Sequence, residues 1–205
     1  MTVQEFCKKI IPFLRKKGVK GVYRKLLEKT NVVPAKNQFL YDFDFLVDDV
    51  KIPFEENEYK IHKNDEVKIL NWVIPEMGKG SGGHLNIFRF VSFLEKMGFH
   101  SRIYLFKAPS LHDNKSVRDF LKENFPILDE RVEAYWDVKY AKFAHTTIAT
   151  SWETAYFVRN FDNTVSKFYF VQDYEPFFFP HGSYYELAKN TYKFGFRGIT
   201  AGDWI

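Results

Sequence analysis

Residues 67–94 constrain the fold of this chain more than any other stretch of its sequence. Residues 67–74 form an almost continuous apolar run without polar alternation, which is typical of a parallel strand buried on both faces. Pro75 and four closely spaced glycines then break the regular structure and permit backbone angles that other residues resist. From about Ser81 the apolar residues recur every three positions, which indicates a helix. Strand, glycine loop and helix open a βαβ unit, which places a crevice beyond the strand's carboxyl end.

The rest of the chain continues this alternation of strands and helices. Further strands are predicted at residues 100–108, 131–136, 146–150, 168–172 and 197–201, and helices at 116–124, 152–158 and 184–192. Such alternation predicts an α/β fold with a Rossmann-like, doubly wound parallel sheet and right-handed crossovers. With 205 residues, 45% of them apolar, the chain is long enough for one domain with a sizeable core.

The positive charge of the chain is concentrated at one end. Residues 1–30 hold nine Lys and Arg against two Glu, a net charge of +7, whereas the other residues carry a net charge of −3. Apolar spacing predicts basic amphipathic helices here, which either lie on an anionic membrane surface or pack on the domain with a solvated basic face. Because the body is mildly acidic, we expect no nucleic-acid partner.

Residues 31–66 show no clear periodicity and are interpreted as an extended lead-in, with a short strand near residues 39–45. Asp42 and Asp44 match an Asp-x-Asp metal–nucleotide pattern, but they precede the first strand and are more typical of surface acids. The single cysteine, Cys7, excludes an internal disulfide and a cysteine zinc cage. Without an apolar run of about 18 residues or a signal-peptide pattern, we expect a cytoplasmic protein. It would be peripheral at the inner membrane if the basic segment binds lipid.

The glycine loop matches the dinucleotide pattern G-x-G-x-x-G between Gly78 and Gly83. That pattern also requires an acidic residue about 20 positions later, at the end of the second strand. Here the second strand ends in Phe106-Lys107-Ala108, which disfavours NAD binding. A phosphate-binding P-loop is also disfavoured, because no Gly-Lys-Ser/Thr closes the loop. The loop would instead let a ligand approach backbone amides.

Polar residues follow several of the predicted strands and should gather at the carboxyl edge of the sheet. The expected ligand-binding residues are Gly82, Gly83, His84, Asn86, Trp152, Glu153, Thr154, Gln172, Asp173, Tyr174 and Glu175, with a fourth segment at residues 201–204. His84 could act as a base or bind a hydroxyl or phosphate, and Asp173 and Glu175 could be acid/base groups or hydroxyl acceptors. Packing, helix capping and loop solvation remain alternatives for these residues. A bulky side chain at Gly83 is expected to block a close approach or to demand a glycine-only backbone angle.

Four segments together resemble a known enzyme family: IPEMGKGSGGHLNIFRF, ATSWETAYFV, FYFVQDYEPFFFPHGSYYELAKNTY and GFRGITAGDWI. In this order they look like the amino-terminal half of bacterial GT-B glycosyltransferases, most closely the WsaF-type rhamnosyltransferases related to glycosyltransferase family 4. The resemblance covers residues 67–205. It implies an acceptor-binding Rossmann-like domain, with the nucleotide-sugar donor held by a carboxyl-terminal second domain, which we expect to be absent from this chain.

The resemblance also implies a function. The parent enzyme would transfer a deoxyhexose, rhamnose from dTDP-rhamnose, to a cell-surface glycan or lipid-linked saccharide, with no metal and no cofactor. Gln172 and Asp173 fall where many family 4 members carry a catalytic histidine, so Asp173 and His84 are the catalytic candidates. A non-catalytic carbohydrate-binding or assembly module is the alternative, and an NAD-type nucleotide-binding protein is a third interpretation.

Overall fold

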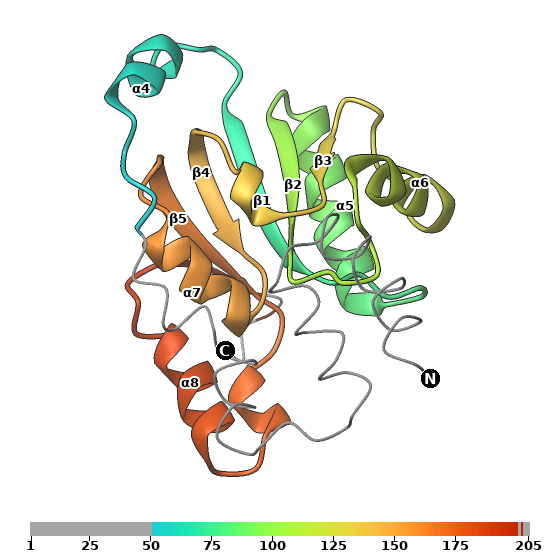
Figure 1. The fold of residues 1–205 in the computed structure, drawn as a ribbon, viewed down its shortest axis with the longest axis vertical. Coiled ribbons are helices and arrows are strands. Elements are labelled where there is room, and N and C mark those ends of the chain that lie inside the picture. Colours follow the sequence, from blue (N-terminus) through green and yellow to red (C-terminus); the bar gives the residue numbers. More distant parts are fainter. Residues whose placement is uncertain (1–50, 201, 203–205) are drawn as a thin grey trace, which may run out of the picture. The chain divides into compact units, whose positions relative to one another are not determined.

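The computed structural model describes residues 51–200 and 202, which belong to one compact unit, Asp49–Ile205. Within this part of the chain, parallel strands form a single sheet in the order β3-β2-β1-β4-β5-β6 (Figure 1). The strands are β1 Ile69–Pro75, β2 His100–Phe106, β3 Glu133–Tyr135, β4 Ala144–Ala149, β5 Thr164–Val171 and β6 Arg197–Thr200. This is the strand order of a doubly wound nucleotide-binding fold. The predicted α/β class is therefore confirmed.

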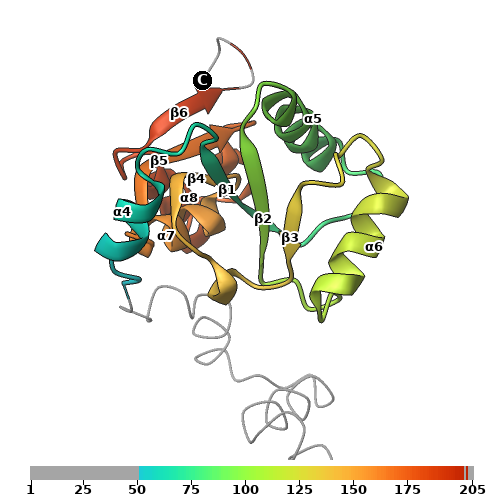
Figure 2. The ribbon, with the colours of Figure 1, turned by 90° about the horizontal axis from the view of Figure 1, so that it is seen from above.

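Helices cover both faces of the sheet, as right-handed crossovers on either side of β1 require (Figure 2). Helices α5 Gly82–Lys96 and α6 Asn114–Asn124 pack on one face, against β2 and β3. Helix α7 Trp152–Asn160 packs on the other face, against β1, β4 and β5, and α8 Ser183–Thr191 lies beside it. Two short 3₁₀ helices, η1 Val138–Tyr140 and η2 Glu175–Phe178, interrupt the connections.

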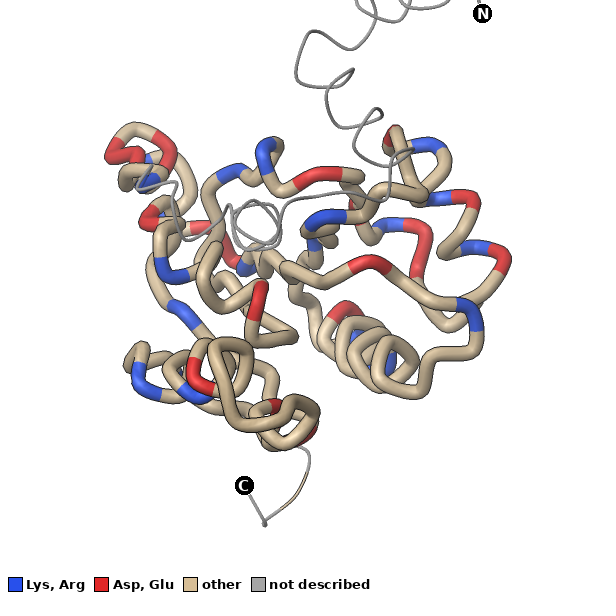
Figure 3. The backbone as a smooth tube through the Cα atoms, turned by 60° about the horizontal axis from the view of Figure 1, so that its bottom comes forward, with Lys and Arg blue, Asp and Glu red and all other residues tan. Residues whose placement is uncertain are grey.

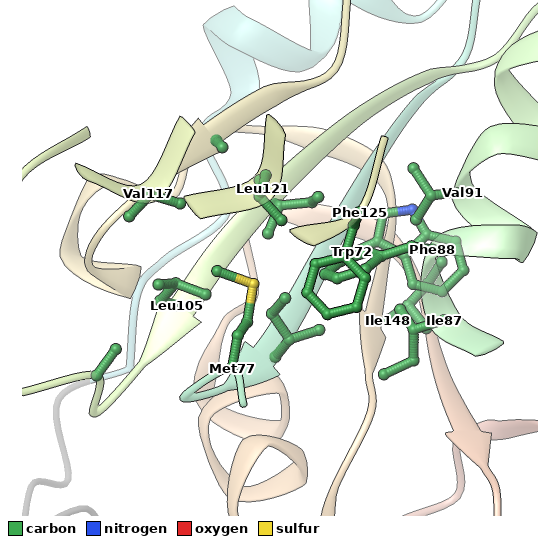
Figure 4. Close-up of a cluster of buried hydrophobic side chains, with 14 of the residues drawn as sticks. Trp72, Met77, Ile87, Phe88, Val91, Leu105, Val117, Leu121, Phe125 and Ile148 are labelled. Atoms are coloured by element: carbon green, nitrogen blue, oxygen red, sulfur yellow. The ribbon is translucent and has the colours of Figure 1, made fainter. Parts of the chain in front are cut away.

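The main hydrophobic core lies between the sheet and the pair α5 and α6 (Figure 4). Trp72 of β1 and Phe88 of α5 have no exposed surface, and the Phe88 ring meets Phe125 edge-on with centroids 4.7 Å apart. The helical spacing of residues 85–94 arises because Phe88 and Val91 form the face of α5 that the sheet buries. This packing fixes the start of α5, and with it the glycine loop, over the end of β1.

The expectation of an extended lead-in is wrong where the structure describes it, because Glu56–His62 forms a helix, α4. None of its residues is buried, so the sequence has no apolar period to reveal it. The side chain of Glu58 accepts hydrogen bonds from the Phe143 amide at 3.3 Å and from Asn163 Nδ2 at 2.9 Å. The folded body therefore begins before the first strand of the sheet.

Several predictions concern residues outside the described part of the chain. These are the basic helices of residues 1–30, Cys7, the short strand at 39–45, Asp42 and Asp44, and residues 201, 203 and 204 of the last polar segment. Among the helices that the structure describes, none has the length and apolar character needed to cross a lipid bilayer.

Candidate ligand-binding site

The direction of the strand order reverses between β1 and β4, and this point defines where a ligand would bind. In doubly wound sheets the connections after the two strands at such a point run in opposite directions and leave a crevice at their carboxyl ends. The segment after β1 is the glycine loop, and the segment after β4 is Thr150-Ser151. The polar segment that follows β5 reaches the same edge of the sheet.

The glycine loop turns tightly into α5. Gly80 has φ +70°, a left-handed conformation that favours glycine, whereas the described geometry of Gly83 involves no such angle. Ser81 begins the helix as its N-cap, and its Oγ accepts a hydrogen bond from the His84 amide at 3.4 Å. The first amides of a helix lack intrahelical partners, so Gly82 and Gly83 present theirs outward at the positive end of α5.

The structure brings the glycine loop and the segment after β5 together. A Cβ atom built on Gly83 would lie 3.6 Å from Nε2 of Gln172, and Nδ2 of Asn86 donates to Gln172 Oε1 at 3.4 Å. Gly83 is therefore close to Gln172 without being strained. An alanine would fit at this position, whereas a longer side chain would meet Gln172. Because Gly83 does not adopt a backbone angle that only glycine tolerates, that part of the expectation is wrong.

A cavity of about 330 Å³ opens at this meeting point. It is lined by residues from the glycine loop, the β4–α7 connection and the segment after β5: Gly83, Thr150, Ser151, Gln172, Asp173, Glu175 and Phe178. We call this space the switch-point cavity. Its wall offers hydroxyl, amide and carboxyl groups together with one aromatic ring, and it includes no lysine or arginine.

Glu175 is the buried carboxyl group of the switch-point cavity, with 8% of its surface exposed. Its Oε2 accepts a hydrogen bond from the amide of Trp152, at the start of α7, at 2.8 Å, and its Oε1 accepts one from the Tyr169 hydroxyl at 3.1 Å. Burial raises the pKa of Glu175 to about 7, although these two hydrogen bonds oppose the shift. Glu175 thus joins the segment after β5 to the first turn of α7.

Asp173 is the more accessible carboxyl group of the same wall. Its Oδ1 accepts a hydrogen bond from the Tyr174 amide at 2.7 Å, which orients the carboxylate within its turn. The Tyr192 hydroxyl donates to the Asp173 carbonyl at 2.9 Å and accepts from the Glu175 amide at 3.1 Å. Tyr192 therefore fixes the backbone on both sides of Tyr174. Sequence reasoning did not single out Tyr192, which lies 17 positions beyond Glu175.

Two of the residues expected to bind a ligand instead stabilise the start of α7. The Thr154 side chain is buried, accepts a hydrogen bond from the Ser151 amide at 3.0 Å, and completes a capping box with Ser151. The Trp152 ring is buried against Tyr156 and Phe179. The pattern Ser-x-x-Thr at residues 151–154 is itself a signal for such a cap.

His84 and three further predicted residues also lie off the cavity wall. Nδ1 of His84 contacts Ser81 Oγ at 2.8 Å, and its Nε2 is buried without a hydrogen-bond partner among the described residues. Burial lowers the pKa of His84, with the Pro75 carbonyl opposing the shift. Gly82 and Tyr174 flank residues of the wall, and Glu153 lies two positions after Ser151, but none of the three lines the cavity. The catalytic role of His84 stays a prediction.

A second hollow, of about 380 Å³, lies at the outer edge of the sheet along β3. It is lined by Asn114, Arg118 and residues 130–135. Within this wall, Glu133 accepts hydrogen bonds from His100 Nε2 at 2.7 Å and from Arg102 Nε at 3.2 Å. Because its wall lies away from the carboxyl ends of β1 and β4, where the strand order reverses, the switch-point cavity is the better candidate for a ligand site. Acidic and basic positions are interspersed along the described chain (Figure 3).

A comparison with known proteins identifies a distant relative. No protein-family model matches the chain. Over 140 residues it is 30% identical to a protein of Myxococcus xanthus named O-antigen biosynthesis protein RfbC. The match covers 65% of this chain and 11% of that protein, so the chain spans only a small part of the length of its relative.

Proposed function

We propose that this chain contributes to polysaccharide biosynthesis as the acceptor-binding domain of a glycosyltransferase. The transferred sugar would be a deoxyhexose, rhamnose from dTDP-rhamnose, and the acceptor a growing surface glycan or a lipid-linked saccharide. The name of the Myxococcus xanthus relative supports the polysaccharide class, and the resemblance of the four sequence segments supports the transfer reaction. The parallel sheet with its switch-point cavity supports a domain that binds a ligand.

The composition of the cavity wall is the observation that carries this proposal. Two carboxyl groups, an amide and two hydroxyl groups line it, and no cationic side chain accompanies them. An anionic ligand such as a nucleoside diphosphate would face Asp173 without a lysine or arginine to offset its charge. A neutral ligand with many hydroxyl groups matches the wall, because carboxylate and amide oxygens accept hydrogen bonds from hydroxyls. The cavity therefore suits a saccharide acceptor better than a nucleotide donor.

Asp173 is the residue we assign to proton transfer in this reaction. The acceptor hydroxyl would donate its proton to the Asp173 carboxylate while its oxygen forms the bond to the anomeric carbon of the donor sugar. The bond between that carbon and the nucleotide's phosphate oxygen would break, and the nucleotide would leave with the electron pair. Gln172 and Ser151 would hold neighbouring hydroxyls. Glu175, held by Trp152 and Tyr169, would keep this turn in place.

A nucleotide-binding protein remains the second candidate, because the strand order is that of dinucleotide-binding folds. Against it, β2 ends at Phe106 and is followed by Lys107, where a carboxylate for the ribose would be expected. Calorimetry of the whole chain distinguishes the two functions. We expect no binding of dTDP or NAD tighter than about 1 mM, equivalent to about −4 kcal/mol. Micromolar binding of either compound would contradict the acceptor assignment.

The function itself is tested by deleting the gene in its host and restoring it. We expect the deletion to change the surface polysaccharide pattern, and the wild-type gene to restore it. Asp173→Asn should fail to restore it, since loss of a general base lowers rates roughly 10²–10⁴-fold. An unchanged polysaccharide in the deletion strain would contradict a role in its synthesis. Full restoration by Asp173→Asn would contradict the proton-transfer assignment.

A further inference from the structure

The segment after β5 contains three consecutive phenylalanines, and the middle one differs from its neighbours. Phe177 meets the Tyr174 ring edge-on with centroids 4.8 Å apart, and Phe179 stacks on Tyr184 at 5.5 Å. No aromatic ring among the described residues packs on Phe178, and 61% of its surface is exposed. Phe178 is also the member of the three that lines the switch-point cavity. Its ring faces are therefore available to a ligand in that cavity.

The backbone holds Phe178 in a fixed place. It is the last residue of η2, whose turns are closed by hydrogen bonds from the Phe177 amide to the Tyr174 carbonyl at 3.0 Å and from the Phe179 amide to the Pro176 carbonyl at 3.1 Å. Pro176 restricts the backbone at the start of η2, and Glu175 ties the same helix to α7. Because the backbone of this segment is already ordered, only the Phe178 side chain would lose conformational freedom when a ligand binds.

We propose that Phe178 is a stacking platform for one pyranose ring of a neutral saccharide, whose hydroxyl groups bind Asp173 and Gln172. This inference rests on the proposed function and deepens it by naming the sugar-contacting side chain. The C–H groups on one face of a pyranose carry partial positive charge and are attracted to the negative face of an aromatic ring. The polar wall and the ring thus match the two kinds of surface that a sugar presents.

The cavity's size and charge favour a saccharide over a lipid chain. Its volume of about 330 Å³ is near the lower end of the range for small-ligand pockets, which suits a mono- or disaccharide. An acyl or prenyl chain would leave the Asp173 carboxylate and the Gln172 amide without hydrogen-bond partners, which is unfavourable. A membrane surface remains an outcome that the experiment can detect.

The test compares variants of two adjacent phenylalanines in the full chain. Binding of methyl α-L-rhamnopyranoside is followed by NMR at about 10 mM, because Kd values near millimolar are typical of weak ligands. Phe178→Ala should weaken binding about 3- to 10-fold, and Phe178→Tyr should stay within about 2-fold of wild type, since the ring supplies the interaction. Phe177→Ala is the matched control, because Phe177 is more exposed, at 74%, and does not line the cavity. It should also stay within about 2-fold of wild type.

Three results would overturn the proposal. One is equal binding by wild type and Phe178→Ala, and another is an equal loss in both alanine variants. The third is a loss of binding to phosphatidylglycerol vesicles, in both alanine variants, while glycoside binding is unchanged, because this would identify a membrane contact. Thermal melts confirm that each variant is folded.

A failure of this inference can be told apart from a failure of the proposed function. If the glycoside binds and Gly83→Leu blocks it while Phe178→Ala does not, the acceptor site stands and the platform is rejected. If wild type binds no glycoside and deletion of the gene leaves the surface polysaccharide unchanged, both are rejected.

Discussion

Two glutamates at opposite ends of the sheet show how differently this fold treats the same side chain. Glu133 begins β3, at the amino ends of the strands, and Glu175 follows β5, at their carboxyl ends. Burial alone would raise the pKa of Glu133, but hydrogen bonds from Tyr135 and His100 and the charge of Arg102 lower it to about 2. Glu175 has neutral donors only, and burial raises its pKa to about 7. The first site favours a charged carboxylate, whereas the second favours a protonated carboxyl group below about pH 7.

The largest predicted effect is a pH dependence of stability caused by Glu175. Its folded-state pKa of about 7 lies above the usual glutamate pKa of 4.5, so the native state keeps a proton that the unfolded state releases. The resulting stabilisation is complete below pH 4.5 and is lost as the pH rises through about 7, a change of about 3 kcal/mol. Denaturant unfolding from pH 4 to 8 measures the free energies of unfolding of wild type and Glu175→Gln, and the difference between them should show this change. If the free energies of unfolding of the two proteins change in parallel with pH, the burial assigned to Glu175 is contradicted.

The next effect is the cost of removing each carboxyl group at about pH 5. Glu175→Ala leaves the Trp152 amide and the Tyr169 hydroxyl without their acceptor, and should cost about 1–3 kcal/mol of unfolding free energy. Glu133→Ala should cost less than about 1 kcal/mol, because 36% of its side chain is exposed and solvent screens the pairs. Chemical denaturation measures both. Equal costs would show that burial does not distinguish the two sites.

Glu133 should give a smaller pH effect of the opposite sign. Its folded-state pKa of about 2 lies below the usual glutamate pKa of 4.5, so its stabilisation is present above pH 4.5 and is lost as the pH falls toward 2. The stability gap between wild type and Glu133→Gln should therefore narrow on acidification, and added salt should narrow it at neutral pH. A gap that widens in acid would rule out the charged network.

The smallest effect is expected at Gly83. A methyl group there makes ordinary contact with Gln172, so Gly83→Ala should change stability by less than about 0.5 kcal/mol. Gly80→Ala is the matched comparison, because its φ of +70° should cost roughly 1–2 kcal/mol for any residue with a Cβ. Thermal melts of both variants measure this difference, and a larger loss at Gly83 than at Gly80 would contradict the described loop.

The sequence predicted the sheet well because its strands and helices differ in apolar periodicity. The strand predicted at residues 67–74 and the helix from about Ser81 agree with β1 and α5 to within two residues at their starts. The sequence predicts a start at residue 168 for β5, but the strand starts at Thr164. Its first residues are not apparent in the sequence because Val165 is exposed and residues 166–168 are only partly buried. Helix α4 was missed because it buries no residue of its own.

The candidate site could be predicted only as a set of segments. The rule that parallel strands end at one edge indicated that residues near Gly83 and Gln172 would meet, and the structure places them together. It could not indicate that Thr154 faces the backbone as a cap or that Tyr192 returns to hold the turn. Nor could it indicate that Phe178 is the one of the three phenylalanines that lines the cavity. These roles depend on tertiary contacts that periodicity does not encode.

One measurement tests most directly whether the switch-point cavity, rather than the hollow beside β3, is the ligand site. It is an amide NMR titration of the full chain with methyl α-L-rhamnopyranoside. We predict shifts at Gly83, Ser151, Gln172 and Asp173, with none at Arg118 or Tyr135 of the β3 hollow. Shifts confined to Arg118 and Tyr135, or absent from both sets of residues, would contradict it.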